Sequence, residues 1–245
     1  MDKYLYVAMS GAKETLRAQT ANNHNLANAS TTGFRGDLSA FQSRAVAGSG
    51  FASRVYAQNA TTGWDDNGGA QMATGRDMDV AVQGTGFIAV QGRDGREAYT
   101  RAGDFRVDAN GQLQTGTGLQ VMSDGGPLSI PPNNSVSIAP DGSISIVPLG
   151  QGPATSATIG RIKLVNPPKD QLDRGDDGLF RLRDGTDAPS DASVHIASGV
   201  LEASNVNTAQ AMVNMIELAR NFDLQVKAIR SAEDTAASST QLLRP

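Results

Sequence analysis

Cysteine is absent from the sequence and aromatic residues are scarce. The 245 residues contain no Cys, and Phe, Trp and Tyr together account for 5% of them. Without cysteine, disulfide frameworks, thiol catalysis and thiolate metal sites are excluded. Because small-molecule pockets are usually lined by hydrophobic and aromatic side chains, the low aromatic content also argues against a deep ligand pocket.

Long apolar runs and an excess of positive charge are missing as well. No stretch approaches the ~20 apolar residues that a membrane-spanning helix requires, so we expect no direct membrane insertion. The N-terminal residues MDKYLYVAMSGAKETLRAQ lack the basic and apolar regions of a secretory signal, so we expect no cleavable signal peptide. The formal net charge of −4 gives no indication of nucleic-acid binding.

Glycine, by contrast, is abundant. The chain contains 27 Gly among 245 residues, which is above the typical share of about 7%. Since these glycines follow no collagen repeat, they indicate many turns and close backbone approaches.

The sequence predicts a helix within residues 1–32. Polar Gln19 and Asn23 interrupt its apolar face, which otherwise follows a heptad spacing of four and three. The small polar residues that end in Gly33 predict the end of this helix. The large apolar residues on the predicted face are Leu5, Met9, Leu16 and Leu26.

A second, longer helix is predicted within residues 201–245. Asn207 followed three residues later by Gln210 resembles a capping box and predicts where the helix begins. Because neither terminal helix can bury its apolar face alone, we expect the two to pack on each other and on neighbouring copies of the chain. The apolar face of the second helix carries Met212, Met215, Phe222, Val226 and Ile229.

The two segments between the predicted helices differ in sequence pattern. Residues 33–75 show no sustained period, and we interpret them as an extended connector with short strands, anchored by Trp64. Residues 76–200 show β patterns, and the alternating VSIAPDGSISIV predicts a hairpin that turns at 140–142. Further turns are expected at 93–95 and 108–111.

The predicted fold class is therefore α+β. Two long terminal helices form a coiled-coil domain, and a mainly antiparallel β domain is inserted between them. The expected domains are the N-terminal helix at 1–32, the connector at 33–75, the β domain at 76–200 and the C-terminal helix at 201–245.

Motifs for cofactors and catalysis are weak. The string GTGFIA resembles a dinucleotide-binding fingerprint, but the next residues, FIAVQ, predict a strand where the fingerprint requires a helix. Gly84 and Gly86 are better explained as a bulge or tight bend between strands. We therefore expect no cofactor.

Metal-binding patterns are equally weak. The string DRGDDG at 173–178 lacks the alternating ligands of a calcium loop and predicts a polar turn. His24 and His195 have no second ligand at a suitable spacing, so no metal site is expected. Dispersed carboxylates could still converge in the fold, which leaves an enzyme such as a glycan hydrolase as an alternative.

The string NLANASTTGFR at residues 25–35 resembles the signature of bacterial flagellar rod and hook proteins. Three further strings resemble later parts of the same family, in the same order: DVAVQGTGFIAVQGRDGREAYTRAGDFRVDANGQL, RGDDGLFRL and SGVLEASNVNTAQAMVNMIELARNF. Gly33 would permit a positive φ, Asn28 would bond to the backbone and Phe34 would anchor the turn. The residues that match the family motif are Asn25, Leu26, Asn28, Thr32, Gly33 and Phe34.

This resemblance implies a structural subunit without catalytic activity or cofactor. In this family the terminal helices form an inner coiled-coil domain of a tubular assembly, and the subunits pass unfolded through the flagellar type III export apparatus. The strings are most similar to the proximal-rod member, whose implied partners are other rod proteins and its own copies in the basal body, in the rod that crosses the periplasm. A distal-rod or hook-type axial protein, and a fibre or adhesion module outside the flagellum, remain as alternatives.

Overall fold

The computed structural model describes residues 3–45, 55–150, 155–175 and 177–242. Asp176, which belongs to the string resembling a calcium loop, lies outside the described residues. So do residues 46–54, which belong to the predicted connector.

The chain forms two compact units. A helical unit combines residues 1–29, 35–66 and 206–245, and a strand-rich unit combines residues 30–34 and 67–205. Each unit therefore contains segments that are far apart in the sequence.

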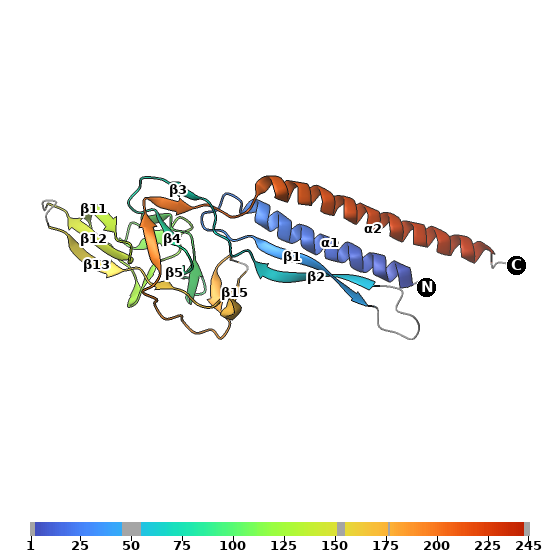
Figure 1. Ribbon diagram of the computed structural model, residues 1–245, viewed down its shortest axis with the longest axis horizontal. Helices are drawn as coiled ribbons and strands as arrows, with labels where there is room; N and C mark the ends of the chain where they lie inside the picture. The colour runs from blue at the N-terminus through green and yellow to red at the C-terminus, as the bar shows by residue number, and fades with distance from the viewer. Residues whose placement is uncertain (1–2, 46–54, 151–154, 176, 243–245) are drawn as a thin grey trace. The chain divides into compact units, whose positions relative to one another are not determined.

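Two long α-helices and one hairpin build the helical unit (Figure 1). The helices α1 (Lys3–Ala27) and α2 (Thr208–Leu242) run side by side in opposite directions, and the hairpin of β1 (Asp37–Ala45) and β2 (Val55–Trp64) lies along α1. The Asn22 side chain of α1 donates to the Ala211 carbonyl of α2 at 2.8 Å. The predicted packing of the two terminal helices on each other is confirmed.

The ends of the helices follow the sequence signals. Helix α1 ends at Ala27, and Gly33 has a φ of 67°, which a glycine adopts without strain. Asn207 caps α2, since its side-chain oxygen accepts a hydrogen bond from the Gln210 N–H at 3.1 Å. The Gln210 amide bonds to Asn214 at 2.9 Å, so the reciprocal half of a capping box is not formed.

The predicted connector contains longer strands than its sequence indicates. Strands β1 and β2 comprise nine and ten residues and pair in antiparallel fashion, with a register shift between Leu38 and Ser39. The described side chains of β1 are all exposed or half-buried, so no buried face imposes an alternating apolar pattern on the sequence. Trp64, at the end of β2, is buried as expected for an anchor.

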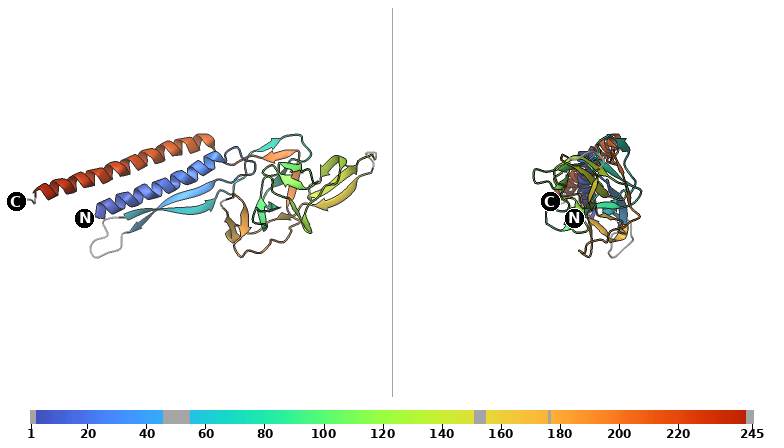
Figure 2. Two further views of the ribbon diagram at one scale, coloured as in Figure 1. Left: turned by 180° about the vertical axis from the view of Figure 1, so that it is seen from behind. Right: turned by 90° about the vertical axis from the view of Figure 1, so that its left-hand side faces the viewer.

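The strand-rich unit contains several small antiparallel sheets, seen from two further directions in Figure 2. The largest has the strand order β14-β5-β6-β16-β15, and a second sheet has the order β11-β12-β13. Two-stranded sheets pair β17 with β4, β18 with β3, β7 with β8 and β10 with β9. The strands are β3 (Gln71–Ala73), β4 (Val80–Gln83), β5 (Phe87–Gln91), β6 (Glu97–Thr100), β7 (Phe105–Val107), β8 (Leu113–Thr115), β9 (Met122–Ser123), β10 (Gly126–Pro127), β11 (Asn133–Ile138), β12 (Ser143–Pro148), β13 (Ala157–Arg161), β14 (Leu164–Val165), β15 (Leu172–Arg174), β16 (Phe180–Leu182), β17 (His195–Ser198) and β18 (Val200–Glu202), with a 3-10 helix at Lys169–Gln171.

The predicted hairpins are confirmed. In the β11–β12 hairpin Ile138 pairs with Ile144, and both side chains are buried in the core of the unit. Its turn uses Gly142 at a φ of 86°, and the turns at Gly95 and Gly111 have φ values of 79° and 80°. The α+β class is thus confirmed. Among the described residues, no helix has the length and apolar character needed to cross a membrane.

Tyr99, on β6, is a fully buried aromatic side chain of the strand-rich unit. It is 0% exposed, and its hydroxyl accepts a hydrogen bond from the Ala188 N–H at 2.6 Å. Burial raises the pKa of this phenol above its ordinary range. The hydroxyl therefore stays protonated and pairs a buried backbone donor.

We expect Tyr99→Phe to lower the free energy of unfolding by about 1–2 kcal/mol, because the buried Ala188 N–H loses its partner. Urea denaturation followed by circular dichroism measures the loss. Tyr6→Phe is the matched control, since Tyr6 is 49% exposed. Equal stability of both variants would contradict this role of the hydroxyl.

Candidate functional site

The structure divides the nine large apolar residues predicted on the helix faces into two groups. Met9, Leu16 and Met212 are 50%, 48% and 54% exposed. The remaining residues are half-buried: Leu5, Leu26, Met215, Phe222, Val226 and Ile229. The helix pair therefore covers only part of the predicted faces.

Small residues occupy the buried face of α1. Ala8, Ala12 and Ala18 are 3%, 8% and 2% exposed. A Cβ added at Gly11 would lie 3.1 Å from the side-chain Cδ of Gln225 on α2, so the Gln225 side chain packs against this glycine. The heptad pattern of large side chains did not predict this buried face, whereas the helical spacing of the small residues would have indicated it.

Each helix also carries large apolar side chains that the described chain leaves about half exposed. The exposed residues on α1 follow a spacing of three and seven, and those on α2 include a spacing of four and eight, so each set lies on one side of its helix. Exposed apolar patches of this kind usually mark protein–protein contacts. The residues are Tyr6, Met9 and Leu16 on α1 and Met212, Val213, Ile216 and Leu224 on α2, and we call these two sets the outer faces.

The matched motif residues at the end of α1 hold the following strand in place. The Asn25 amide donates to the Asp37 carbonyl at 2.9 Å and accepts from the Asp37 N–H at 2.7 Å. Nδ1 of His24 lies 2.7 Å from the Asp37 carboxylate. The Asn28 side-chain amide donates a hydrogen bond to the His24 carbonyl at 2.9 Å. The sequence did not predict how Asn25 recognises β1.

The glycine of the motif lies against another backbone segment of the strand-rich unit. The Gly33 N–H donates to the Glu202 carbonyl at 2.7 Å, and a Cβ added at Gly33 would lie 2.3 Å from the carbonyl carbon of Arg101. Phe34 is buried, and the Arg174 guanidinium lies 4.4 Å from the centre of its ring. Thr32 is half-buried.

A buried ion pair lies beside this glycine. Nε of Arg101 donates to Oε2 of Glu202 at 2.8 Å, and the two side chains are only 7% and 2% exposed. The other oxygen of Glu202 accepts from the Gly69 N–H at 3.0 Å. The remaining Arg101 nitrogens donate to the carbonyls of Val82, Gly84 and Gly86 at 2.8–3.1 Å. The two residues are 101 positions apart in the sequence, and no local pattern predicts that they pair.

The Gly84–Gly86 bend thus has a role opposite to that of a dinucleotide loop. A phosphate cradle directs backbone N–H groups at an anion, whereas here carbonyl oxygens converge on a cation. The following residues form strand β5, as predicted.

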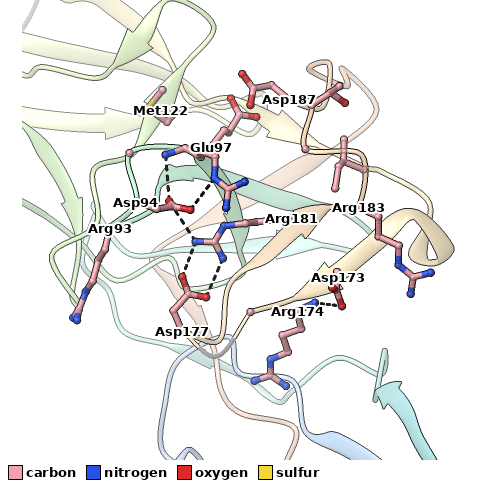
Figure 3. Close-up of a pocket in the computed structure, with 16 residues that line it drawn as sticks. Arg93, Asp94, Glu97, Met122, Asp173, Arg174, Asp177, Arg181, Arg183 and Asp187 are labelled. Atoms are coloured by element: carbon pink, nitrogen blue, oxygen red, sulfur yellow. Dashed lines mark hydrogen bonds and ion pairs between the residues drawn. The ribbon is translucent and has the colours of Figure 1, made fainter.

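The strand-rich unit also carries a charged groove of about 750 Å³, lined by five arginines and five acidic residues (Figure 3). The Arg181 guanidinium lies between Asp177, at 2.7 Å, and Asp94, at 3.6 Å. The hydrogen bond from Arg181 holds the pKa of Asp177 below its ordinary value, and the bond from Arg96 does the same for Asp94. Neither carboxyl group therefore suits a general acid, which requires a raised pKa.

The two histidines do not converge on a common site. His24 pairs with Asp37 in the helical unit, and His195 is exposed on β17 in the strand-rich unit. Within the part of the chain that the structure describes, no three His, Asp or Glu side chains are grouped closely enough to hold a metal ion.

Gly33→Ala should destabilise the strand-rich unit more than Gly75→Ala does. Gly75 has a similar φ of 71° but open space around its Cα, so alanine there adds backbone strain of about 1–2 kcal/mol. At Gly33 the added methyl group also overlaps the Arg101 backbone, which we expect to cost about 1–3 kcal/mol more. Chemical denaturation of both variants measures the difference, and equal losses would exclude the close approach.

Arg101→Gln should lower the free energy of unfolding by about 3–5 kcal/mol, because it leaves the Glu202 carboxylate buried without its cation. Arg96→Gln is the matched control. Its Nε–carboxylate distance of 2.9 Å resembles that of Arg101, but its side chain is 67% exposed. Exposed pairs contribute little, so the control should lose far less stability. Similar melting temperatures for the two variants would contradict the role of Arg101 as the stabilising partner of the buried Glu202 carboxylate.

Comparison with known proteins covers the whole chain. The family described as "Flagellar hook protein FlgE/F/G D1 domain" matches residues 81–146, and "Flagellar basal body rod FlgEFG protein C-terminal" matches residues 197–242. The flagellar basal-body rod protein FlgF of Escherichia coli is 43% identical over 99% of both chains, and that of Salmonella typhimurium is 42% identical over the same shares. FlgG of Bacillus subtilis is 32% identical over 100% of both chains. The chain therefore belongs to the family of flagellar basal-body rod proteins.

Proposed function

We propose that the chain is a structural subunit of the proximal rod of the bacterial flagellum. The observation that carries the proposal is the pair of outer faces, where large apolar side chains on α1 and α2 are about half exposed. Copies of the chain and other rod proteins cover these faces in the assembly. The rod then transmits torque and supports motility.

Assembly follows from the same physics as folding. Burial of an apolar side chain contributes about 1.5–3 kcal/mol, so several partly exposed side chains on each helix favour association. A face on one copy that meets a different face on the next gives a heterologous contact, and such contacts extend into a helical filament when the rotation does not close.

The terminal helices form the coiled-coil domain when the subunits assemble in the rod. In it, the helices within 1–32 and 201–245 use the half-buried residues within one subunit and Met9, Leu16 and Met212 between subunits. Residues 33–75 connect this domain to the β domain at 76–200. Isolated amphipathic helices are only marginally stable in water, which suits subunits that pass unfolded through the type III export apparatus.

The alternative functions within the family are those of proximal-rod, distal-rod and hook-type proteins, which occupy different positions along the flagellar axis. Two FlgF relatives are 43% and 42% identical to the chain, against 31–32% for the FlgG relatives, which supports the proximal rod over the distal rod. An enzyme such as a glycan hydrolase is disfavoured, because the arginines of the charged groove hold Asp94 and Asp177 ionised. No cofactor enters the proposed function.

We expect Leu16→Glu and Ile216→Glu each to abolish incorporation into basal bodies while the chain still folds, because both side chains are exposed in the subunit and buried in the assembly. Immunoblots of purified basal bodies measure incorporation. The fluorescence of Trp64, the single tryptophan, reports on the helical unit.

Leu149→Glu serves as the control, since Leu149 is 61% exposed in the strand-rich unit and lies on neither helix. Normal incorporation of the two helix variants, or equal loss in the control, would contradict assembly through the outer faces.

A further inference from the structure

Sulfur chemistry in this protein is confined to methionine, since the chain has seven Met and no Cys. Among the described methionines, Met9, Met72 and Met212 are 50%, 53% and 54% exposed. The other described methionines are half-buried: Met78, Met122 and Met215. The chain thus has a distinct set of thioethers open to solvent.

Two of the three exposed methionines lie on the outer faces. Met9 is near the start of α1, and Met212 is near the start of α2. Because the helices are antiparallel, with Gly11 beside Gln225 and Asn22 beside Ala211, the two sulfur atoms mark opposite ends of the helix pair. Met72 lies on β3 of the strand-rich unit and belongs to neither helix.

We propose that Met9 and Met212 are sites of sulfoxide formation, and that their oxidation prevents a free subunit from entering the rod. The proposal rests on the proposed function, because it requires the outer faces to be covered in the assembly. Once covered, the two sulfur atoms are shielded, so that the reaction acts on subunits before incorporation.

The oxidant is a hydroperoxide such as hydrogen peroxide. The methionine sulfur attacks the terminal peroxide oxygen with its lone pair, an S–O bond forms and the O–O bond breaks. The proton on the transferred oxygen passes to the departing oxygen, which leaves as water when the oxidant is hydrogen peroxide. The thioether is thereby oxidised to the sulfoxide and the peroxide is reduced. No further reductant or cofactor is required.

The product changes the chemistry of the outer faces. A thioether is apolar and adapts its shape to a neighbouring surface. A sulfoxide carries a polar oxygen that loses its water on burial and finds no donor on an apolar partner. We expect each sulfoxide to weaken the contact roughly tenfold or more.

Peroxide mapping of the purified full-length chain tests the reactivity. Peptide mass spectrometry after treatment with hydrogen peroxide should show that Met9, Met72 and Met212 gain one oxygen several-fold faster than Met78 and Met122. Equal rates for all five residues would overturn the assignment, whatever the chain's function.

Substitutions test the consequence for assembly. Glutamine, which is similar in length and polar, imitates the sulfoxide, and leucine keeps the apolar character but cannot be oxidised at sulfur. The Met9→Gln, Met212→Gln double variant should enter basal bodies at least tenfold less than the unaltered chain. The Met9→Leu, Met212→Leu double variant should enter normally and keep this capacity after peroxide treatment of cells.

Met72→Gln is the matched control, because Met72 is equally exposed but lies outside the helices. Normal entry of the glutamine double variant, or an equal defect in the Met72 control, would overturn the inference and leave the rod assignment intact. Failure of the unaltered chain and of the leucine variant to enter basal bodies would instead refute the proposed function, and the inference with it.

Discussion

The buried contact between Arg101 and Glu202 determines how distant parts of the strand-rich unit meet. Removing two charges from water costs several kcal/mol for each ion, so such a pair persists only where further hydrogen bonds satisfy both groups. Here the bend at 82–86 supplies three carbonyls to the arginine, and Gly69 supplies an N–H to the carboxylate. The Glu202 backbone in turn receives Gly33. One ion pair therefore connects the first, middle and last segments of the unit.

Glycine is required wherever this contact brings backbones together. Gly33 lies so close to Arg101 that no side chain fits, and its positive φ directs the chain into the following segment. The bend that carries Gly84 and Gly86 exposes carbonyls to the guanidinium. The high glycine content noted in the composition thus has a specific structural cause at these positions.

The helical unit obeys a different constraint. Small residues on α1 allow α2 to approach closely, and this arrangement leaves several large apolar side chains on the outside of both helices. If those side chains were buried within the subunit, the monomer would be more stable but would have less apolar surface for assembly. We therefore place the function of the protein on its surfaces, and the family to which it belongs agrees with that placement.

Elements whose signals are local could be predicted from the sequence. Periodicity, the Asn207 cap and the Gly-containing turns specified both helices and the hairpins of the strand-rich unit that turn at 93–95, 108–111 and 140–142, because hydrogen bonds within a few residues stabilise each of them. The β1–β2 hairpin was not predicted. Only the tertiary structure decided that Ala8, Ala12 and Ala18 are buried while Met9 and Leu16 are exposed, since a heptad does not show which of two apolar faces meets the partner helix. It also decided the pairing of Arg101 with Glu202 and of Asn25 with Asp37. Contacts between residues that are far apart in the sequence depend on tertiary packing. Local sequence patterns do not show which of these residues meet.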